Sequence, residues 1–376
     1  MKPMKPMKPM KPMKFSERAR IVEMSGIRKF FQNAGPDAVN LGIGQPDFPT
    51  PEHIKRAGIE AIEKNLTGYT NNYGVPELRE AISKKFGREN NLSYPADNII
   101  VTAGAGEALH IAVESLVGKG DTVLYQDPGF VSYKECTVIA GGTPKGIPLD
   151  GNFHIDVERC KEALDTAAVL ILNSPGNPTG AVESEESIKA IVQYAEDKGA
   201  TVISDEVYEH FVYEKKHYSA GCYGDNVVTV NAASKTFSMT GWRLGYVAGP
   251  KDFIEQAVKI HQYCQTCASS VSQYAAIAAY NGSMACVDEM RHEYAVRRDL
   301  LYNGLKDLGF DFPKPEGAFY MLVPMDRKQF EKILAAGVVA IPGDAFGENA
   351  VNYARFSYAA SRENIAEALR RIATAV

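Results

Sequence analysis

The feature that most constrains the fold is the regular alternation of short apolar runs with helical patterns along the middle of the chain. Residues 98–117, NIIVTAGAGEALHIAVESLV, show the repeating unit, in which an apolar strand, a glycine turn and an amphipathic helix follow one another. Strands separated by helices of this length indicate right-handed crossovers and a mostly parallel sheet. The strand cores are continuously apolar, which is typical of a sheet with helices on both faces. The sequence therefore predicts an α/β protein.

The C-terminal part of the chain follows a different pattern. Residues 271–309 and 361–376 have helical periodicity, and the stretches GAFYMLV, VVAIPG and YARFSYA between them are strand-like. We expect a smaller α/β domain over 271–376, joined in space by an N-terminal segment over 15–46. The large domain is then expected over 47–270.

The first residues, 1–14, form the repeat MKPMKPMKPMKPMK. Proline at this period favours an extended, solvated chain, so we expect a disordered leader of artificial origin, with a basic arm for an acidic partner as the alternative. The net charge is −5 even with the leader's lysines, and an acidic body is unsuited to nucleic acid. Without a long apolar run or a hydrophobic signal stretch, and with six scattered cysteines, we expect a cytoplasmic protein that does not bind membranes.

Chemically distinctive residues follow the predicted strands at their carboxyl ends. In a parallel α/β sheet these ends form one edge, and ligands bind there. Each residue is a weak signal by itself, because glycine turns and helix-capping carboxylates are common. Five such positions at equivalent places predict a single site, and they are Gly104-Ala105-Gly106, Phe130, Asn177, Asp205 and Lys235.

Part of this set suits a phosphate attached to an aromatic ring. The turn with Ala105 and Gly106 opens a helix, whose N–H groups and dipole favour an anion. Ser234 and Arg243 can add a hydroxyl and a guanidinium to the same anion. Phe130 offers a flat face on which a ring can stack.

The rest of the set suits the ring itself. Asp205 can hold a proton on a ring nitrogen, while Tyr208 and Asn177 can hydrogen-bond a phenolate. Lys235 can form a Schiff base with an aldehyde, provided that burial and nearby positive charge lower its pKa. Phosphate, aromatic ring, pyridine nitrogen, phenolate and aldehyde together describe pyridoxal 5′-phosphate.

The same segments resemble a known family. The motifs LGIGQPDFPTP, GYTNNYGVPELREAI, NSPGNPTG, SDEVY, SKTFSMTGWRLGY and ARFSYA occur in the order found in class I and II aminotransferases of fold type I, and the resemblance runs from about Ile21 to the C-terminus. The segments SGIRKFF and ISDEVYEHF are similar to those of the gamma subgroup, especially of its archaeal aromatic and aspartate members. The resemblance implies a pyridoxal-phosphate-binding large domain placed between two segments of the small domain.

The resemblance also assigns roles to residues of the cofactor site. It implies that Lys235 binds the cofactor aldehyde and then moves the substrate proton, and that Asp205 pairs with the pyridine nitrogen. Tyr208 and Asn177 are expected to hydrogen-bond the ring oxygen O3′.

Further roles concern the substrate and a second subunit. The resemblance implies that Arg355 binds the substrate α-carboxylate, helped by Asn177 and the N–H of Gly44. Tyr69 is expected to reach the phosphate of the neighbouring subunit, which makes the active unit a homodimer.

The activity implied is transfer of an amino group from an aromatic L-amino acid or aspartate to 2-oxoglutarate, by a ping-pong Schiff-base mechanism. A β-eliminating carbon–sulfur lyase with the same cofactor and a non-catalytic sensing domain stay open as alternatives.

Two positions depart from the family pattern. Ala232 replaces a serine that many members carry at the phosphate, and Gly106 replaces a lysine that grips the side-chain carboxylate in some aspartate-specific members. No metal is expected, because the histidines are dispersed and the pair Cys264 and Cys267 has no second pair.

Overall fold

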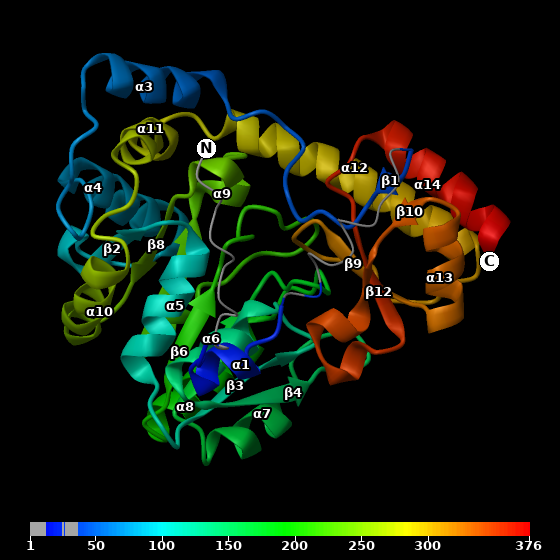
Figure 1. Cartoon of the computed structure of the whole chain (residues 1–376), viewed down its shortest axis with the longest axis horizontal. Helices are drawn as coiled ribbons and strands as arrows, with labels where there is room; N and C mark the ends of the chain where they lie inside the picture. Colours follow the sequence, from blue (N-terminus) through cyan, green and yellow to red (C-terminus); the bar gives the residue numbers. More distant parts are fainter. Residues whose placement is uncertain (1–12, 25, 27–36) are drawn as a thin grey trace, which may run out of the picture.

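In the computed structural model, residues 13–24, 26 and 37–376 are described. Of the leader predicted to be disordered over residues 1–14, residues 1–12 lie outside the described part. The centre of the molecule is a seven-stranded sheet in the order β2-β8-β7-β6-β5-β3-β4, shown in cyan and green in Figure 1. Its strands are β2 (Ile99–Thr102), β3 (Thr122–Asp127), β4 (Thr143–Pro148), β5 (Val169–Asn173), β6 (Thr201–Asp205), β7 (Val227–Ala232) and β8 (Gly245–Ala248).

The mostly parallel sheet predicted from the sequence is confirmed. β4, β3, β5, β6 and β7 pair in parallel, and β8 alone is reversed, since it pairs antiparallel with both β2 and β7. The sequence pattern did not indicate β8. A Cβ on Gly245, at its start, would lie 2.5 Å from the backbone carbon of Gly104, so glycine permits the close approach of β8 to the turn after β2.

Helices cover both faces of this sheet, as the continuously buried strands require. On one face, α5 and α10 pack against side chains of β2 and of β5 to β8 in one apolar cluster. On the opposite face, α7 and α8 pack in a second cluster. α3, α4 and α11 form a further group at one end of the sheet (Figure 1). The helices are α3 (Glu52–Glu63), α4 (Pro76–Lys85), α5 (Ala105–Leu116), α6 (Ser132–Ala140), α7 (Val157–Leu164), α8 (Glu185–Asp197), α9 (Ala233–Thr236), α10 (Lys251–Cys264) and α11 (Ser270–Asn281).

The C-terminal region contains a second, smaller sheet. Three strands pair antiparallel in the order β11-β12-β9, and a parallel pair of β1 and β10 lies beside them. Because β1 pairs with β10, the segment around residue 39 joins the C-terminal region in space. The elements are β1 (Val39–Asn40), β9 (Tyr320–Pro324), β10 (Val338–Val339), β11 (Ile341–Pro342), β12 (Tyr353–Ser357), α12 (Ala285–Asp307), α13 (Arg327–Ala335) and α14 (Arg362–Ala375).

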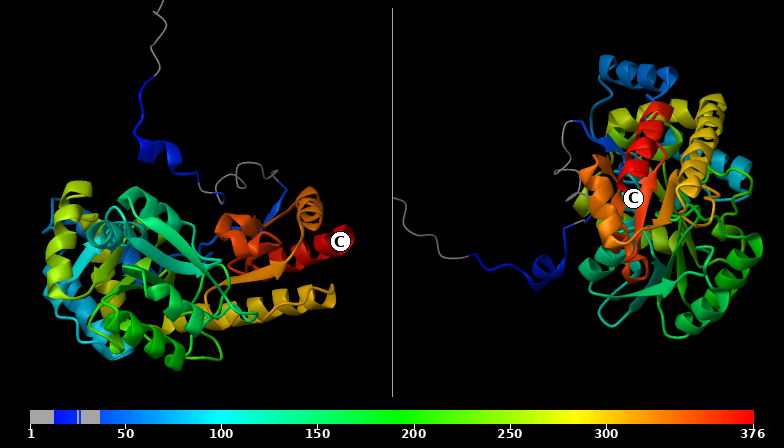
Figure 2. Two further views of the ribbon diagram at one scale, coloured as in Figure 1. Left: turned by 90° about the horizontal axis from the view of Figure 1, so that it is seen from below. Right: turned by 90° about the vertical axis from the view of Figure 1, so that its right-hand side faces the viewer.

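The helical pattern over 271–309 divides into two helices where one continuous helix was predicted. α11 ends at Asn281 and α12 begins at Ala285, and the break contains Gly282, whose extended backbone leaves the helix. α11 packs against α3 and α4, whereas α12 packs against α14. Figure 2 shows α12 (gold) and α14 (red) running along the smaller sheet, beside the seven-stranded layer. The predicted domain limits stay predictions.

Short elements complete the described chain. α1 (Glu17–Ile21) buries none of its residues and lies at the surface beside α6 (Figure 2). Among the described residues, none of the helices has the length and apolar character needed to cross a membrane. The single-turn elements are η1 (Phe86–Asn90), η2 (Ala96–Asn98), η3 (Ala220–Cys222), η4 (Thr240–Trp242), η5 (Gly343–Phe346) and η6 (Glu348–Ala350).

Candidate active site

Lys235 lies on α9, which begins immediately after β7 ends. Its ammonium group donates to the carbonyl oxygen of Gly44 at 2.7 Å and lies 5.9 Å from the ring centroid of Tyr208. Burial, with the nearby charges of Arg355 and Arg243, lowers the pKa of Lys235 to about 8. About one such lysine in ten is then neutral at pH 7, against about one in three thousand for a free side chain. The structure therefore provides the conditions that make a lysine nucleophilic.

Asp205 ends β6 with its carboxylate buried. Oδ2 accepts a hydrogen bond from the hydroxyl of Tyr133 at 2.8 Å, and Oδ1 accepts one from the N–H of Val207 at 3.4 Å. Burial raises the pKa of Asp205 to about 6, while the bond from Tyr133 opposes that rise. The carboxyl group is therefore mostly ionised at pH 7, and no Lys or Arg forms a close ion pair with it in the described chain. A protonated ring nitrogen would supply the missing positive charge.

Arg355, on β12, is buried without a carboxylate partner among the described residues. Its guanidinium donates to Asn177 Oδ1 at 2.8 Å and to the carbonyl oxygen of Gly42 at 2.7 Å, and its Nε has no partner. The side chain is only 2% exposed. A buried cation is costly unless an anion joins it, so the site is suited to a carboxylate ligand.

Asn177 is held in place by the end of β5. Its backbone N–H donates to Asn173 Oδ1 at 2.9 Å, and the amide of Asn173 donates in turn to the carbonyl oxygen of Asp205 at 2.9 Å. The last residue of β5 thus connects the loop that carries Asn177 to the end of β6. This explains why the two loops, which are separate in the sequence, meet at one edge of the sheet.

Tyr208 meets a residue that the sequence pattern did not single out. Its hydroxyl lies 2.9 Å from the hydroxyl of Tyr320, the first residue of β9. Tyr320 also lies against Gly44, where a Cβ would come within 2.2 Å of the tyrosine oxygen. Tyr133 was missed as well, although it follows Phe130 by three residues. Both tyrosines occupy positions that look like ordinary core packing in a sequence.

The turn before α5 forms a cradle for an anion. Gly104 has a φ of 83°, and a Cβ on it would lie 2.6 Å from the guanidinium of Arg243. Arg243 donates to the carbonyl oxygens of Ala103 at 3.2 Å and Thr240 at 3.1 Å, and it forms no ion pair within the described chain. Glycine thus admits an unpaired guanidinium beside the first N–H groups of α5, an arrangement that fits a phosphate.

The remaining predicted residues differ in burial. Ser234 is buried on α9, and Phe130 is half-buried with its ring edge-on to Tyr133, the centroids 5.7 Å apart. Gly106 faces open space, since a Cβ there would meet no atom within 4 Å. Tyr69 is 90% exposed, so its predicted contact with a neighbouring subunit stays a prediction.

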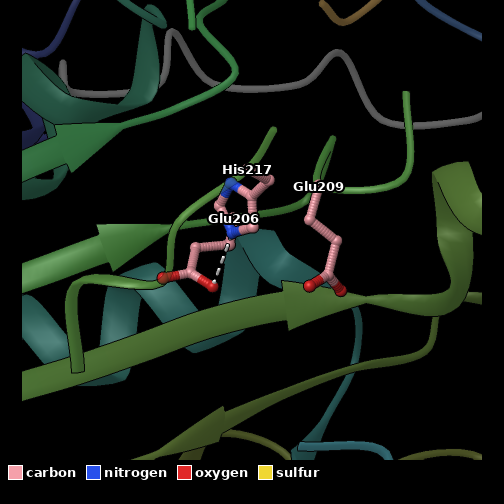
Figure 3. A group of neighbouring side chains, drawn as sticks. All are labelled: Glu206, Glu209 and His217. Carbon is pink, nitrogen blue, oxygen red and sulfur yellow. Dashed lines mark hydrogen bonds and ion pairs between the residues drawn. The ribbon is translucent and has the colours of Figure 1, made fainter. Parts of the chain in front are cut away.

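A second cluster of charged residues lies behind the active-site edge. Glu206, Glu209 and His217 place ligand atoms within 4.8 Å of one another, a spacing that a metal ion could use (Figure 3). The carboxylate oxygens are already engaged, however. Glu206 accepts from Ser204, Ser219, His217 and the N–H of Ala220, and Glu209 accepts from Lys85, Asn90 and Asn231. The ammonium group of Lys85 supplies the positive charge, so the cluster has a structural explanation without a metal.

Comparisons with known proteins agree with this geometry. A model of the family described as aminotransferase class I and II matches residues 36–372. The chain is 46% identical to the probable aspartate aminotransferase of Methanocaldococcus jannaschii, over 94% of this chain and 97% of that protein. It is 38% identical to aromatic-amino-acid aminotransferase 2 of Thermococcus litoralis, over 95% of this chain and 97% of that protein.

Solved structures give the same result. The aspartate aminotransferase of Thermus thermophilus with maleate has a TM-score of 0.93 at 36% identity, covering 97% of this chain and 100% of that one. The aromatic aminotransferase of Pyrococcus horikoshii has a TM-score of 0.87 at 39% identity, covering 93% of this chain and 98% of that one. The fold is therefore that of the fold type I transferases. The chain belongs to the aminotransferase class I and II family, and it is an aminotransferase.

Proposed function

We propose that this enzyme uses pyridoxal 5′-phosphate to transfer an amino group from an L-amino acid, aromatic or aspartate, to 2-oxoglutarate. The observation that carries the proposal is the position of Lys235. Its ammonium group, with a pKa lowered to about 8, lies between a buried carboxylate that lacks a close cation and a buried arginine that lacks an anion. One ligand with a basic ring, joined to a substrate with a carboxylate, would satisfy all three groups.

The residues divide the work of holding the cofactor. When bound, pyridoxal phosphate supplies an aldehyde for Lys235 and a ring that withdraws electrons from the substrate Cα. Arg243 and the N–H groups at Ala105 and Gly106 are placed to hold its phosphate. Asp205 would keep a proton on the ring nitrogen, and Tyr133, which donates to Asp205, fixes the direction of that carboxylate.

Other residues hold the substrate and move its proton. Arg355 binds the α-carboxylate with donors that are already oriented by Asn177 and Gly42. With the cofactor bound, Lys235 would take the proton from the substrate Cα and hand it on to the cofactor carbon that carried the aldehyde, as a base with a pKa of about 8 can do near neutral pH. Exclusion of water by Tyr320 and Phe346 around Arg355 strengthens its charge interaction.

Two features support the proposed donor class. The named relatives include aspartate and aromatic-amino-acid aminotransferases, so both donors are within the range of similar proteins. Gly106 faces open space and carries no side chain that could bind a second carboxylate. We therefore place aromatic amino acids first and aspartate second.

We also propose a homodimer located in the cytoplasm. Ile59 and Ile62 on α3, with Leu66 and Tyr69 just after it, are exposed and form an apolar surface that a second copy would cover. Tyr69, at the end of this surface, would then reach the partner's phosphate site. All six cysteines are free, which supports a reducing compartment.

The test is a panel of L-amino acids, each mixed with the cofactor-loaded enzyme without an acceptor. We expect bleaching of the visible absorption in a single turnover, fastest with aromatic amino acids, and its return when 2-oxoglutarate is added. Formation of pyruvate and ammonia from cysteine-like substrates would instead show β-elimination. A loaded enzyme whose absorption no amino acid changes would contradict the proposal.

A further inference from the structure

Tyr320 joins the two sheets of the molecule at the active site. It is the first residue of β9, in the small C-terminal sheet, and it is 1% exposed. Its side chain contacts Arg355 from the same sheet and Tyr208 from the loop after β6 of the large sheet. Both neighbours hold the substrate or the cofactor in the proposed function, whereas Tyr320 was given only the exclusion of water around Arg355, so its two contacts can be considered separately.

The ring of Tyr320 fixes the plane of the Arg355 guanidinium. Its centroid lies 4.3 Å from the guanidinium carbon, and the ring of Phe346 lies 4.7 Å from it. The register of β9 with β12 sets this contact, because Tyr320 pairs with Ser357, two residues from Arg355 on the same strand. Two aromatic rings thus hold a cation that has no carboxylate partner, which keeps its donors aimed at one place.

The hydroxyl of Tyr320 acts on Tyr208. The two oxygens are 2.9 Å apart, and either can be the donor. A tyrosine hydroxyl has a single proton, so Tyr208 can donate to a cofactor oxygen only if Tyr320 donates to Tyr208. In the arrangement that leaves the Tyr208 proton for the cofactor, Tyr320 is therefore the donor of this pair.

We propose that Tyr320 is a positioning residue with two separable functions: its ring holds Arg355 for the substrate carboxylate, and its hydroxyl directs the Tyr208 hydroxyl toward the cofactor ring oxygen. The inference rests on the proposed function. It adds a residue from the small sheet to the control of a group on the large one. The charged groups that face the pair are Asp205 at the end of β6, Lys235 on α9 and Arg355 on β12.

The test uses two substitutions and two readouts on the cofactor-loaded enzyme. Tyr320→Phe keeps the ring and removes the hydroxyl, so Tyr208 becomes a weaker donor and negative charge on the ring oxygen is less stabilised. We expect the pH midpoint of the visible absorption band to rise by about half a unit or more, while the dissociation constant of 3-phenylpropionate, a carboxylate without an amino group, changes less than about threefold.

Tyr320→Leu removes the ring as well. We expect it to raise the dissociation constant of 3-phenylpropionate about tenfold and to shift the absorption midpoint as Tyr320→Phe does. If this variant does not fold, Phe346→Leu removes the opposite ring and is expected to weaken the inhibitor without moving the midpoint. Tyr302→Phe is the control, because Tyr302 is a half-buried tyrosine on α12 that packs on Phe312 in the C-terminal region, and it should change neither readout.

Two results would overturn the inference. An absorption midpoint in Tyr320→Phe within 0.1 unit of the wild type, roughly the precision of such a titration, would remove the function of the hydroxyl. Unchanged inhibitor affinity in the ring variants would remove the function of the ring. Failure of the wild-type enzyme to develop any visible band with pyridoxal phosphate is a different outcome, since it would contradict the proposed function itself.

Discussion

The side chains from Asp205 to Glu209 face two environments, which differ in whether the buried charges have partners. Asp205 and Tyr208 reach the active-site edge, whereas Glu206 and Glu209 turn into the charged cluster behind it. In the cluster, each carboxylate has several donors, and Figure 3 shows Glu206 paired with His217. At the active-site edge, Asp205 and Arg355 are buried without opposite charges. The difference separates buried charges that have partners within the described chain from buried charges that, in our proposal, find theirs in a ligand.

The largest expected effect is on turnover by Lys235→Ala. Loss of the nucleophile and proton carrier should lower kcat by about 10⁴-fold or more. The free energy of unfolding of the cofactor-free protein should not fall, because the variant removes a desolvated ammonium group. Steady-state kinetics and thermal unfolding check both parts. A variant with a tenth of normal turnover would remove Lys235 from the chemistry.

The next effect compares two buried arginines. Arg355→Leu should lower kcat/KM by about 10³-fold through lost carboxylate binding, with a change in stability of only about 1 kcal/mol. Arg298 is equally buried but pairs with Glu214 and Asp299 and also donates to the carbonyl oxygen of Pro315, so Arg298→Leu should instead lower stability by about 2 kcal/mol. Urea unfolding and kinetics on both variants distinguish the two. Equal losses of unfolding free energy in the two variants would contradict the difference between the two arginines.

Glu209→Gln tests the cluster itself. Although burial raises it, the charges of Lys85 and His210 bring the pKa of Glu209 well below its ordinary value. A depressed carboxyl pKa stabilises the fold above the unfolded-state value near 4.5 and loses that effect as the pH falls toward the folded-state value. The variant leaves Lys85 with only the more distant carboxylate of Glu89, at 3.8 Å, and should cost about 3 kcal/mol at pH 7. The kcat of the folded variant should stay near the wild-type value.

The double variant Lys85→Met/Glu209→Gln is the matched control, because it leaves no unpaired charge and should recover much of the lost stability. Recovery supports a structural ion pair. A double variant as unstable as the single one would mean that hydrogen bonds, and not the charge pair, account for the loss.

Asp205→Asn should change stability in the opposite direction. Burial raises the pKa of Asp205 to about 6, so ionisation above that pH destabilises the fold and stability increases as the pH falls from about 6 toward 4. The asparagine variant lacks this ionisation, and at pH 7 it should be about 1 to 3 kcal/mol more stable without cofactor. Unfolding between pH 4 and 8 measures it. A less stable variant at pH 7 would contradict the difference drawn between the two regions.

Much of the fold is predictable from the sequence because its strands are apolar and its turns carry Gly, Pro and Asn. Gly282 is harder to interpret, since a single glycine inside a helical pattern is often tolerated, yet here it separates α11 from α12. The reversed strand β8 was missed because it is short and follows the irregular turn at Arg243, whose φ is 53°. Nothing in local periodicity shows the direction of such a strand.

The candidate site was predictable where a residue follows a strand and has distinctive chemistry. Lys235, Asp205 and Asn177 meet that condition, and the structure places them at one edge, although their roles stay proposals. Tyr133 and Tyr320 do not meet it. A tyrosine in a helix or an apolar strand looks like core, and only the three-dimensional contacts of its hydroxyl distinguish it.

The most direct measurement is chemical mapping of the cofactor lysine. The protein is incubated with pyridoxal 5′-phosphate at pH 8, reduced with borohydride, digested and analysed by mass spectrometry. The account predicts stoichiometric phosphopyridoxyl modification of the peptide that contains Lys235, and none there in Lys235→Ala. Modification spread over exposed lysines, with Lys235 unlabelled, would contradict the account.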